Sequence, residues 1–321
     1  MKAQITAIGH YIPDTIIDNK YLQDKFHIDA DSIYKRTGIK ERRYASDGIT
    51  TTDLVSNAVT DLLKNANKTI QDIDCLIVGT LTPDYFFPST AVSSINRLNA
   101  HRTWGFDLSA ACSGFCYGVN IAKAMVEQGQ IKNAIVVGAE KMSATLNNFD
   151  YKTGILFGDG AGAVLIEGSD DDQHAIKGTL CKVEADDMND VYFKTPFNAT
   201  NWVNEKFELA GHKVYKNGVS LTIETIKEYL QQNNLSLSDF TYIVPHQANM
   251  RMLTEIAKGL ETKIDNFLIN IEKRGNTGGA SIPICLSEFH QQGKLKKGDR
   301  LLLCSFGSGY TISIVDLVWS I

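Results

Sequence analysis

Short runs of apolar residues recur along the chain and predict buried β-strands. Each run has three to five residues, is rich in β-branched side chains and is bounded by Gly, Pro or Asp. This pattern is typical of strands that are covered on both faces. The predicted strands occupy residues 5–8, 75–78, 134–137, 163–166, 242–244, 301–304 and 311–315.

Helical patterns separate several of these runs. Apolar residues recur every three or four positions in residues 53–65, and residues 218–231 carry Val219, Ile223, Ile226 and Leu230. Strands that alternate with helices indicate an α/β protein with largely parallel, buried sheets.

The two halves of the chain resemble each other in pattern. In the first half AIVVGAE precedes GILFGDGAGAVLIEG, and in the second half YIVPHQAN and LLLCSFGSGYTISIVDL occupy comparable places. Each half is therefore expected to end in a strand, a Gly-rich turn and another strand, forming a hairpin. We predict a duplicated domain with halves 1–168 and 169–321, and the acidic segment GSDDDQ (168–173) as the boundary loop.

Composition excludes several classes of protein. The 321 residues carry a net charge of −5, which argues against a general nucleic-acid binder. No apolar run approaches the roughly 18 residues of a membrane span, and the N-terminus lacks the apolar core of a signal peptide. Six scattered cysteines without a CxxC pair indicate neither a disulfide framework nor a zinc site. A soluble, cytoplasmic protein is expected.

The segment FDLSAACSGFCYGVNIAKAMVEQG contains the strongest candidate for a nucleophile. Residues 106–108 end a predicted strand, and a buried helix face begins after Ser113 and ends at Gly129. Cys112 therefore lies at a helix N-terminus, where unpaired N–H groups and the helix dipole are expected to lower the pKa of its thiol. The alternative is a cysteine that only fits a tight turn. Cys116, one helical turn later, could form a metal pair with Cys112, but no His or acidic residue completes such a site, so Cys116 is assigned to the core.

Two further segments contain candidate polar groups. In YIVPHQANMRML, His246 directly follows a predicted strand, a place where α/β proteins often position functional groups, and histidine can transfer protons near neutral pH. In RGNTGGASIPICLSEF, Asn276 lies in a Gly-rich turn before the predicted helix 282–289. Asn276 either adopts a left-handed backbone there, or donates its amide to a developing oxyanion or enolate.

The glycine cluster 158–162 (GDGAG) could be a phosphate cradle for a nucleotide. A strand follows it instead of a helix, so we predict a structural turn.

Taken together, these segments resemble the β-ketoacyl-acyl carrier protein synthase III family of the thiolase-like superfamily. The resemblance covers essentially the whole chain and rests on six motifs in register. They are RTGIKERR near Arg36, AACSGF around Cys112, FGDGAGAVL, VPHQANMR around His246, GNTGGASIP around Asn276, and the terminal FGSGYT.

This resemblance implies a five-layered αβαβα thiolase-like fold built from two duplicated halves. It also implies a decarboxylating Claisen condensation that initiates fatty-acid synthesis. Cys112 would be the acyl-carrying nucleophile, His246 and Asn276 would hold an enolate oxygen, and the backbone N–H groups of Cys112 and Ser308 would form the oxyanion hole. No cofactor or metal is implied, since coenzyme A or phosphopantetheine thioesters are the substrates.

The resemblance implies binding partners as well. Arg36, Phe87, Lys152 and Asn249 would contact the donor or its acyl chain, with Phe87 often reaching in from the partner subunit of a homodimer. An acyl carrier protein would dock on a basic patch formed by Lys216, Arg251 and Lys258. For Arg251 the alternative is an ordinary ion pair with Glu255 on the helix surface.

Two positions depart from the family pattern. Ser32 falls where the family has a tryptophan that stacks on the donor's adenine, and Tyr151 replaces a donor-contacting arginine beside Lys152. Loss of both groups weakens the case for coenzyme A as donor. Two alternatives therefore stay open. One is a specialised ketosynthase or acyltransferase that couples longer or β-ketoacyl chains, and the other is a non-catalytic subunit.

Overall fold

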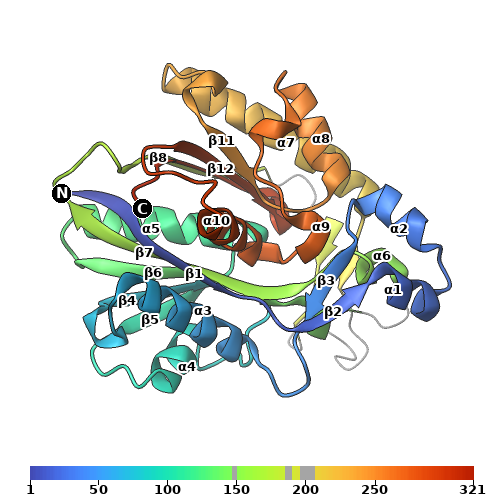
Figure 1. Ribbon diagram of the computed structural model, residues 1–321, viewed down its shortest axis with the longest axis horizontal. Coiled ribbons are helices and arrows are strands. Elements are labelled where there is room, and N and C mark those ends of the chain that lie inside the picture. Colours follow the sequence, from blue (N-terminus) through green and yellow to red (C-terminus); the bar gives the residue numbers. More distant parts are fainter. Residues whose placement is uncertain (147–149, 185–189, 196–206) are drawn as a thin grey trace.

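The computed structural model describes residues 1–146, 150–184, 190–195 and 207–321. Two mixed β-sheets form its framework (Figure 1). The first sheet has the order β1-β7-β6-β4-β5: β1 (Lys2–Tyr11), β7 (Asp159–Ser169), β6 (Asn133–Lys141), β4 (Cys75–Gly79) and β5 (Trp104–Leu108). The second has the order β11-β12-β13-β8: β11 (Tyr242–Pro245), β12 (Arg300–Gly307), β13 (Thr311–Val318) and β8 (Ile176–Val183). All seven predicted strands lie within these elements.

Helices cover both sheets and separate them. The helices packed on the sheets are α3 (Thr51–Ala66), α4 (Thr90–Arg97), α5 (Gly114–Glu127), α7 (Gly211–Gln232), α8 (Met250–Gly259) and α10 (Ser281–Gln291). The other described α-helices are α1 (Asn19–Phe26), α2 (Ala30–Thr37), α6 (Tyr151–Gly154) and α9 (Ile271–Arg274). Two small hairpins, β2 (Thr15–Asp18) with β3 (Glu41–Tyr44) and β9 (Val191–Tyr192) with β10 (Glu208–Leu209), lie beside the sheets.

Five layers follow from this arrangement, as expected for the fold class. In Figure 1, α3 and α4 cover the outer face of the first sheet, α5 and α10 lie between the sheets, and α7 and α8 cover the second sheet. The middle layer and the inner faces of both sheets share one apolar cluster that includes Phe115, Val119 and Leu286. Separate clusters fill the spaces beneath α3 and beneath α7 and α8.

The two sheets repeat one topology. β1-β7-β6-β4 corresponds to β8-β13-β12-β11, and in both sheets the first three strands are antiparallel neighbours while the last pair is parallel. This correspondence corrects the sequence pairing of the halves. AIVVGAE in β6 corresponds to LLLCSF in β12, whereas YIVPHQ in β11 corresponds to β4. The boundary after residue 168 falls in the last residues of β7 and stays a prediction.

The glycine cluster at 158–162 is not a turn, which corrects a second expectation. Residues 159–162 lie inside β7, which pairs with β6 after the long connection 142–158. A Cβ at Gly162 would come within 2.6 Å of the backbone nitrogen of Ile284. A Cβ at Gly160 would lie 3.0 Å from the Cδ1 atom of the same Ile284. These glycines are required because α10 packs directly on the strand.

Candidate active site

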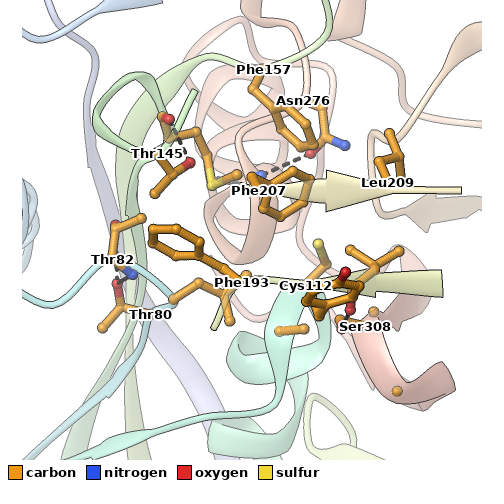
Figure 2. A pocket seen from close by; sticks show the side chains of 18 of the residues that line it. Thr80, Thr82, Cys112, Thr145, Phe157, Phe193, Phe207, Leu209, Asn276 and Ser308 are labelled. Carbon is orange, nitrogen blue, oxygen red and sulfur yellow. Dashed lines mark hydrogen bonds between the residues drawn. The ribbon is translucent and has the colours of Figure 1, made fainter. Parts of the chain in front are cut away.

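A cavity of about 1600 Å³ lies between the two halves (Figure 2). Among its lining residues are the three predicted functional side chains Cys112, His246 and Asn276. They are delivered by the end of β5, the end of β11 and the turn before α10, segments that are far apart in the sequence. The fold therefore brings together the three groups that sequence reasoning selected.

Cys112 is presented by a sharp turn between β5 and α5. Ala111 has a φ of 49°, a left-handed conformation that a residue with a Cβ rarely adopts. Thr311 of the second half holds this turn: its Oγ1 donates to the Ala110 carbonyl (3.1 Å), and its own carbonyl accepts from Ser113 Oγ (3.0 Å). The turn is thus fixed from both halves, with the half-buried Cys112 facing the cavity.

The thiol of Cys112 does not have the lowered pKa expected from its helix N-terminus. Burial raises the pKa of Cys112 to about 12, and the nearby Glu140 carboxyl acts in the same direction. Desolvation of the charged form outweighs the helix dipole here. The resting group is therefore a neutral thiol, and its proton must be removed when it attacks.

Cys116 lies in the apolar core between the sheets, as expected. Within the described ranges, no group of three or more His, Cys, Asp or Glu side chains is placed to hold a metal ion.

His246 is buried at the carboxyl end of β11. Its backbone N–H donates to the Cys304 carbonyl (2.8 Å), and its ring packs edge-on against Phe306. Nδ1 lies 2.7 Å from Ser281 Oγ, which also accepts from the Gln247 N–H (3.3 Å). Burial lowers the pKa of His246 to about 3, so the imidazole is neutral at physiological pH. The Ser281 hydroxyl can either accept from Nδ1–H or donate to an unprotonated Nδ1. In the first case Nε2 presents a lone pair to the cavity, and in the second case it presents a proton.

Asn276 does not use the left-handed backbone considered from its sequence. Gly275 (φ 65°) and Gly278 (φ 55°) carry that conformation instead. The N–H of Asn276 donates to the Leu156 carbonyl (2.9 Å), and its carbonyl accepts from the Gly158 N–H (3.0 Å), which ties the turn to the first half. Its side-chain Oδ1 accepts from the Gly278 N–H (2.9 Å), which leaves the amide Nδ2 as a donor for a ligand.

Ser308 follows β12 and adjoins the nucleophile. A Cβ on the preceding Gly307 would lie 2.7 Å from the backbone nitrogen of Cys112, so the two backbone segments are in contact. The side chain of Ser308 donates to the Val191 carbonyl and so turns away from a catalytic role. Figure 2 shows Asn276 across the cavity from Cys112 and Ser308.

The rest of the described cavity wall is largely apolar. Phe157 and Phe207 meet edge to face with ring centroids 5.3 Å apart, and Figure 2 places Phe193 and Leu209 beside them. Such a wall suits an acyl chain rather than a charged ligand.

The predicted donor-binding residues are divided between two hollows and the surface. Lys152 and Asn249 line the main cavity, and Asn249 caps α8 while its Nδ2 donates to the Arg36 carbonyl (3.2 Å). Arg36 lines a separate hollow of about 250 Å³ together with the two departing residues, Ser32 and Tyr151. Phe87 is 84% exposed and does not line the cavity of its own chain.

The three predicted docking residues are exposed on the outer helices. Lys216 lies on α7, and Arg251 and Lys258 lie on α8. The guanidinium of Arg251 lies 5.8 Å from the centroid of the Tyr215 ring, and in the described parts of the chain it forms no ion pair with Glu255. Asn249, the residue that caps α8, lines the cavity, so the helix that carries Arg251 and Lys258 begins at the cavity wall.

Sequence reasoning missed Ser281 and Glu140. Ser281 is the polar first residue before the apolar run 282–286 of α10, a signal that could have been noticed. Glu140 is a charged residue that follows the apolar run 134–139 of β6, and it is completely buried.

Comparisons with known proteins agree along the whole chain. Residues 106–184 match the family described as 3-oxoacyl-[acyl-carrier-protein (ACP)] synthase III, and residues 230–319 match its C-terminal counterpart. The chain is 40% identical to the beta-ketoacyl-[acyl-carrier-protein] synthase III of Clostridioides difficile (strain 630), with 100% of this chain and 99% of the relative covered.

Solved structures give the same result. The 3-oxoacyl-[acyl-carrier-protein] synthase III of Aquifex aeolicus VF5 superimposes with a TM-score of 0.92 at 35% identity, covering 99% of this chain and 100% of that one. The priming beta-ketosynthase of the R1128 polyketide biosynthetic pathway has a TM-score of 0.93 at 27% identity, covering 99% and 96%. No helix in the described part of the chain is long and apolar enough to cross a membrane.

Proposed function

Because the chain belongs to the 3-oxoacyl-[acyl-carrier-protein] synthase III family, we propose that Cys112, His246 and Asn276 carry out its initiating condensation. The protein is an acyltransferase-class condensing enzyme of fatty-acid synthesis, and its relatives favour this activity over the specialised alternative. The observation that carries the residue assignment is the convergence of the three side chains on one cavity.

In the first step Cys112 takes the acyl group from a thioester donor. The thiol attacks the donor's carbonyl carbon, Nε2 of neutral His246 accepts its proton, and the donor's thiol leaves with that proton. The N–H groups of Cys112 and Ser308 receive the tetrahedral oxygen. The product is an acyl thioester on Cys112.

In the second step a malonyl thioester loses carbon dioxide. The electrons of the broken C–C bond form an enolate. For this step His246 takes its other neutral tautomer, in which Nδ1 accepts from the Ser281 hydroxyl and Nε2 carries the proton. Nε2–H of His246 and Nδ2–H of Asn276 then hold the enolate oxygen. Two donors at one developing charge in a water-poor pocket contribute on the order of 10²–10³-fold each. The enolate carbon then attacks the acyl carbonyl on Cys112, and the C–S bond of the acyl-enzyme breaks. The released Cys112 thiolate takes up one proton from solvent, which the decarboxylation consumes overall. These steps transfer only acyl groups and protons, so the proposal uses no metal or redox cofactor.

The proposed partners are an acyl carrier protein and an acyl-coenzyme A or acyl-carrier donor. The exposed cations Lys216, Arg251 and Lys258 on α7 and α8 support docking of an acidic carrier. We also propose that Lys152 and Asn249, which line the cavity, contact the arm of the substrate, and that Arg36 contacts the donor from the smaller hollow. The proposed compartment is the cytoplasm, which suits six cysteines that are all free thiols.

A homodimer is also proposed. β5 is an edge strand of the first sheet, and it carries Trp104, which is 48% exposed. Tyr85, Phe86 and Phe87 add exposed aromatic surface nearby in the chain. An unpaired strand edge beside exposed aromatic side chains is suited to pairing with a second copy, and Phe87 could then reach the partner's cavity.

The first experiment measures the intact mass of the protein after brief exposure to acyl donors. Acetyl-coenzyme A, octanoyl-coenzyme A and a β-ketoacyl-carrier protein are tested in parallel, with Cys112→Ala as control. Acetylation on Cys112 supports initiation from a short primer. Labelling only by the longer or carrier-bound donors contradicts it, and labelling that survives Cys112→Ala overturns the nucleophile assignment.

A second experiment separates the two half-reactions. His246→Ala and Asn276→Ala are expected to lose malonyl decarboxylation by about 10²-fold or more each. Asn276→Ala should keep acylation of Cys112, because its amide acts only on the enolate. Decarboxylation that survives both substitutions would contradict the enolate roles.

A further inference from the structure

Glu140 is a buried carboxyl group beside the proposed active site that the condensation chemistry does not use. It is the second-last residue of β6, its side chain is fully buried, and its carboxyl group lies close enough to Cys112 to raise the pKa of that thiol when ionised. The residue that follows it, Lys141, directs its Nζ to the Ile49 carbonyl (2.6 Å) and forms no ion pair with Glu140. Burying a carboxyl group without a cationic partner costs folding free energy. Its remaining contacts therefore indicate its role.

One set of contacts comes from the segment after β4 in the first half. The Leu81 N–H donates to both carboxyl oxygens (3.2 and 3.0 Å). Thr82 Oγ1 and Thr80 Oγ1 donate to Oε2 (3.1 and 3.4 Å). These bonds fix the carboxyl group rigidly with respect to the first half.

The second set of contacts comes from the turn that carries Asn276. The backbone N–H of Gly279 lies close enough to the same carboxyl to favour its charged form, and a Cβ at Gly279 would lie 3.5 Å from Oε1. A Cβ at Gly278 would lie 2.8 Å from Cγ of Glu140, and a Cβ at Gly138 would lie 2.2 Å from the Gly279 carbonyl oxygen. The turn therefore rests directly on β6, and its glycines leave the space that Glu140 fills.

This contact reaches Asn276 through one hydrogen bond. The Gly278 N–H, adjacent to the N–H of Gly279, holds Oδ1 of Asn276 at 2.9 Å. The orientation of that amide decides whether Nδ2–H points toward the enolate oxygen. A displacement of about 1 Å at such a donor can cost on the order of 10²-fold in rate.

We propose that Glu140 is a positioning residue for Asn276: its carboxyl group anchors the Gly278–Gly279 backbone to the first half and thereby fixes the amide that stabilises the enolate. The inference rests on the proposed function. Burial raises the pKa of Glu140 to about 8, which keeps it mainly uncharged at neutral pH. A neutral carboxyl can anchor the turn without opposing the negative enolate.

The test compares the two half-reactions in Glu140 variants of the full-length protein. Glu140→Ala should lower malonyl decarboxylation by about 10- to 100-fold while acylation of Cys112 changes less than about threefold. Glu140→Gln should stay within about threefold of wild type in both, because its amide oxygen can accept from Gly279 while its NH₂ group donates to the threonine hydroxyls. Acylation at the wild-type rate also shows that a variant is folded. If Glu140→Ala does not fold, Glu140→Asp replaces it, since the shorter side chain withdraws the carboxyl from Gly279.

A double-mutant cycle shows whether Glu140 acts through Asn276. In an Asn276→Ala background, loss of the Glu140 side chain should cost less than about twofold further. Asp316→Ala is the matched control, because Asp316 is a buried carboxyl whose partners Arg300 and Tyr229 do not line the cavity, and it should affect both half-reactions alike.

Two results would overturn the inference: an equal loss in both half-reactions, or an undiminished loss in the Asn276→Ala background. A wild-type protein that does not decarboxylate malonyl-carrier protein would instead contradict the proposed function itself.

Discussion

Alkylation of Cys112 by iodoacetamide is expected to be slow at neutral pH and to keep rising up to pH 10. The reason is burial, which raises the thiol pKa from about 9 to about 12. This higher pKa lowers the fraction of Cys112 present as thiolate at pH 7 by about 10³-fold relative to an ordinary cysteine. A more basic thiolate is intrinsically more nucleophilic, and with a Brønsted slope of about 0.4–0.5 this recovers roughly 15- to 30-fold. Cys112 should therefore react about 30- to 70-fold more slowly than an ordinary exposed cysteine.

The assay follows intact mass during alkylation between pH 6 and pH 10, with glutathione as a reference thiol. Cys112→Ala is measured in parallel, because Cys181 is also exposed and reacts in both proteins. A Cys112-specific rate that exceeds the glutathione rate, or that levels off below pH 8, would refute the reasoning. Such a result would show that the helix N-terminus outweighs desolvation at this turn.

Four other outcomes are expected. Burial lowers the pKa of His246 to about 3, so between pH 6.5 and about 3 the unfolded state binds more protons than the folded state. The free energy of unfolding, measured by denaturation, should therefore fall by up to about 1.4 kcal/mol per pH unit on acidification. An equally steep fall in His246→Phe would contradict this. Ser281→Ala removes the partner of Nδ1 and should lower kcat about 10- to 100-fold, whereas an unchanged kcat would mean that Ser281 does not orient the ring. Ser32→Trp should lower KM for acyl-coenzyme A but not for carrier-bound donors. Equal effects on both donors would contradict the idea that the adenine of coenzyme A binds in the small hollow at Ser32. Arg251→Glu should raise KM for carrier-bound substrate about tenfold or more while leaving a small thioester mimic unaffected, and the difference should shrink in high salt.

Much of the architecture could be predicted from the sequence because hydrophobic periodicity reports burial directly. Strands such as residues 75–78 and helices such as residues 53–65 lie inside β4 and α3. Cys112, His246 and Asn276 could be selected because each follows a strand or precedes a helix. The roles assigned to them remain predictions.

Errors arose where a residue's surroundings come from distant parts of the chain. The glycines of 158–162 indicated a turn, but their reason is contact with α10, more than a hundred residues later. The thiol pKa of Cys112 was expected to be lowered by the local helix end, whereas desolvation by burial in the folded protein raises it. The sequence indicated a repeat but matched the wrong segments, because two Gly-rich segments look alike. The sheet order shows instead that β6 corresponds to β12.

The glycine contacts between the halves limit how this enzyme can be re-engineered. Methyl groups at Gly138 and Gly162 would come within 2.2 and 2.6 Å of opposing backbone atoms. Even a Gly→Ala substitution at either position would therefore disturb the contact between the halves. A library that aims at longer acyl chains should therefore leave the contact between the halves untouched. Its diversity belongs on the apolar wall at Phe207 and Leu209, whereas Phe157 should be kept because its two chain neighbours hold the turn of Asn276. Substrate range and chemical machinery can then evolve on separate surfaces of one cavity.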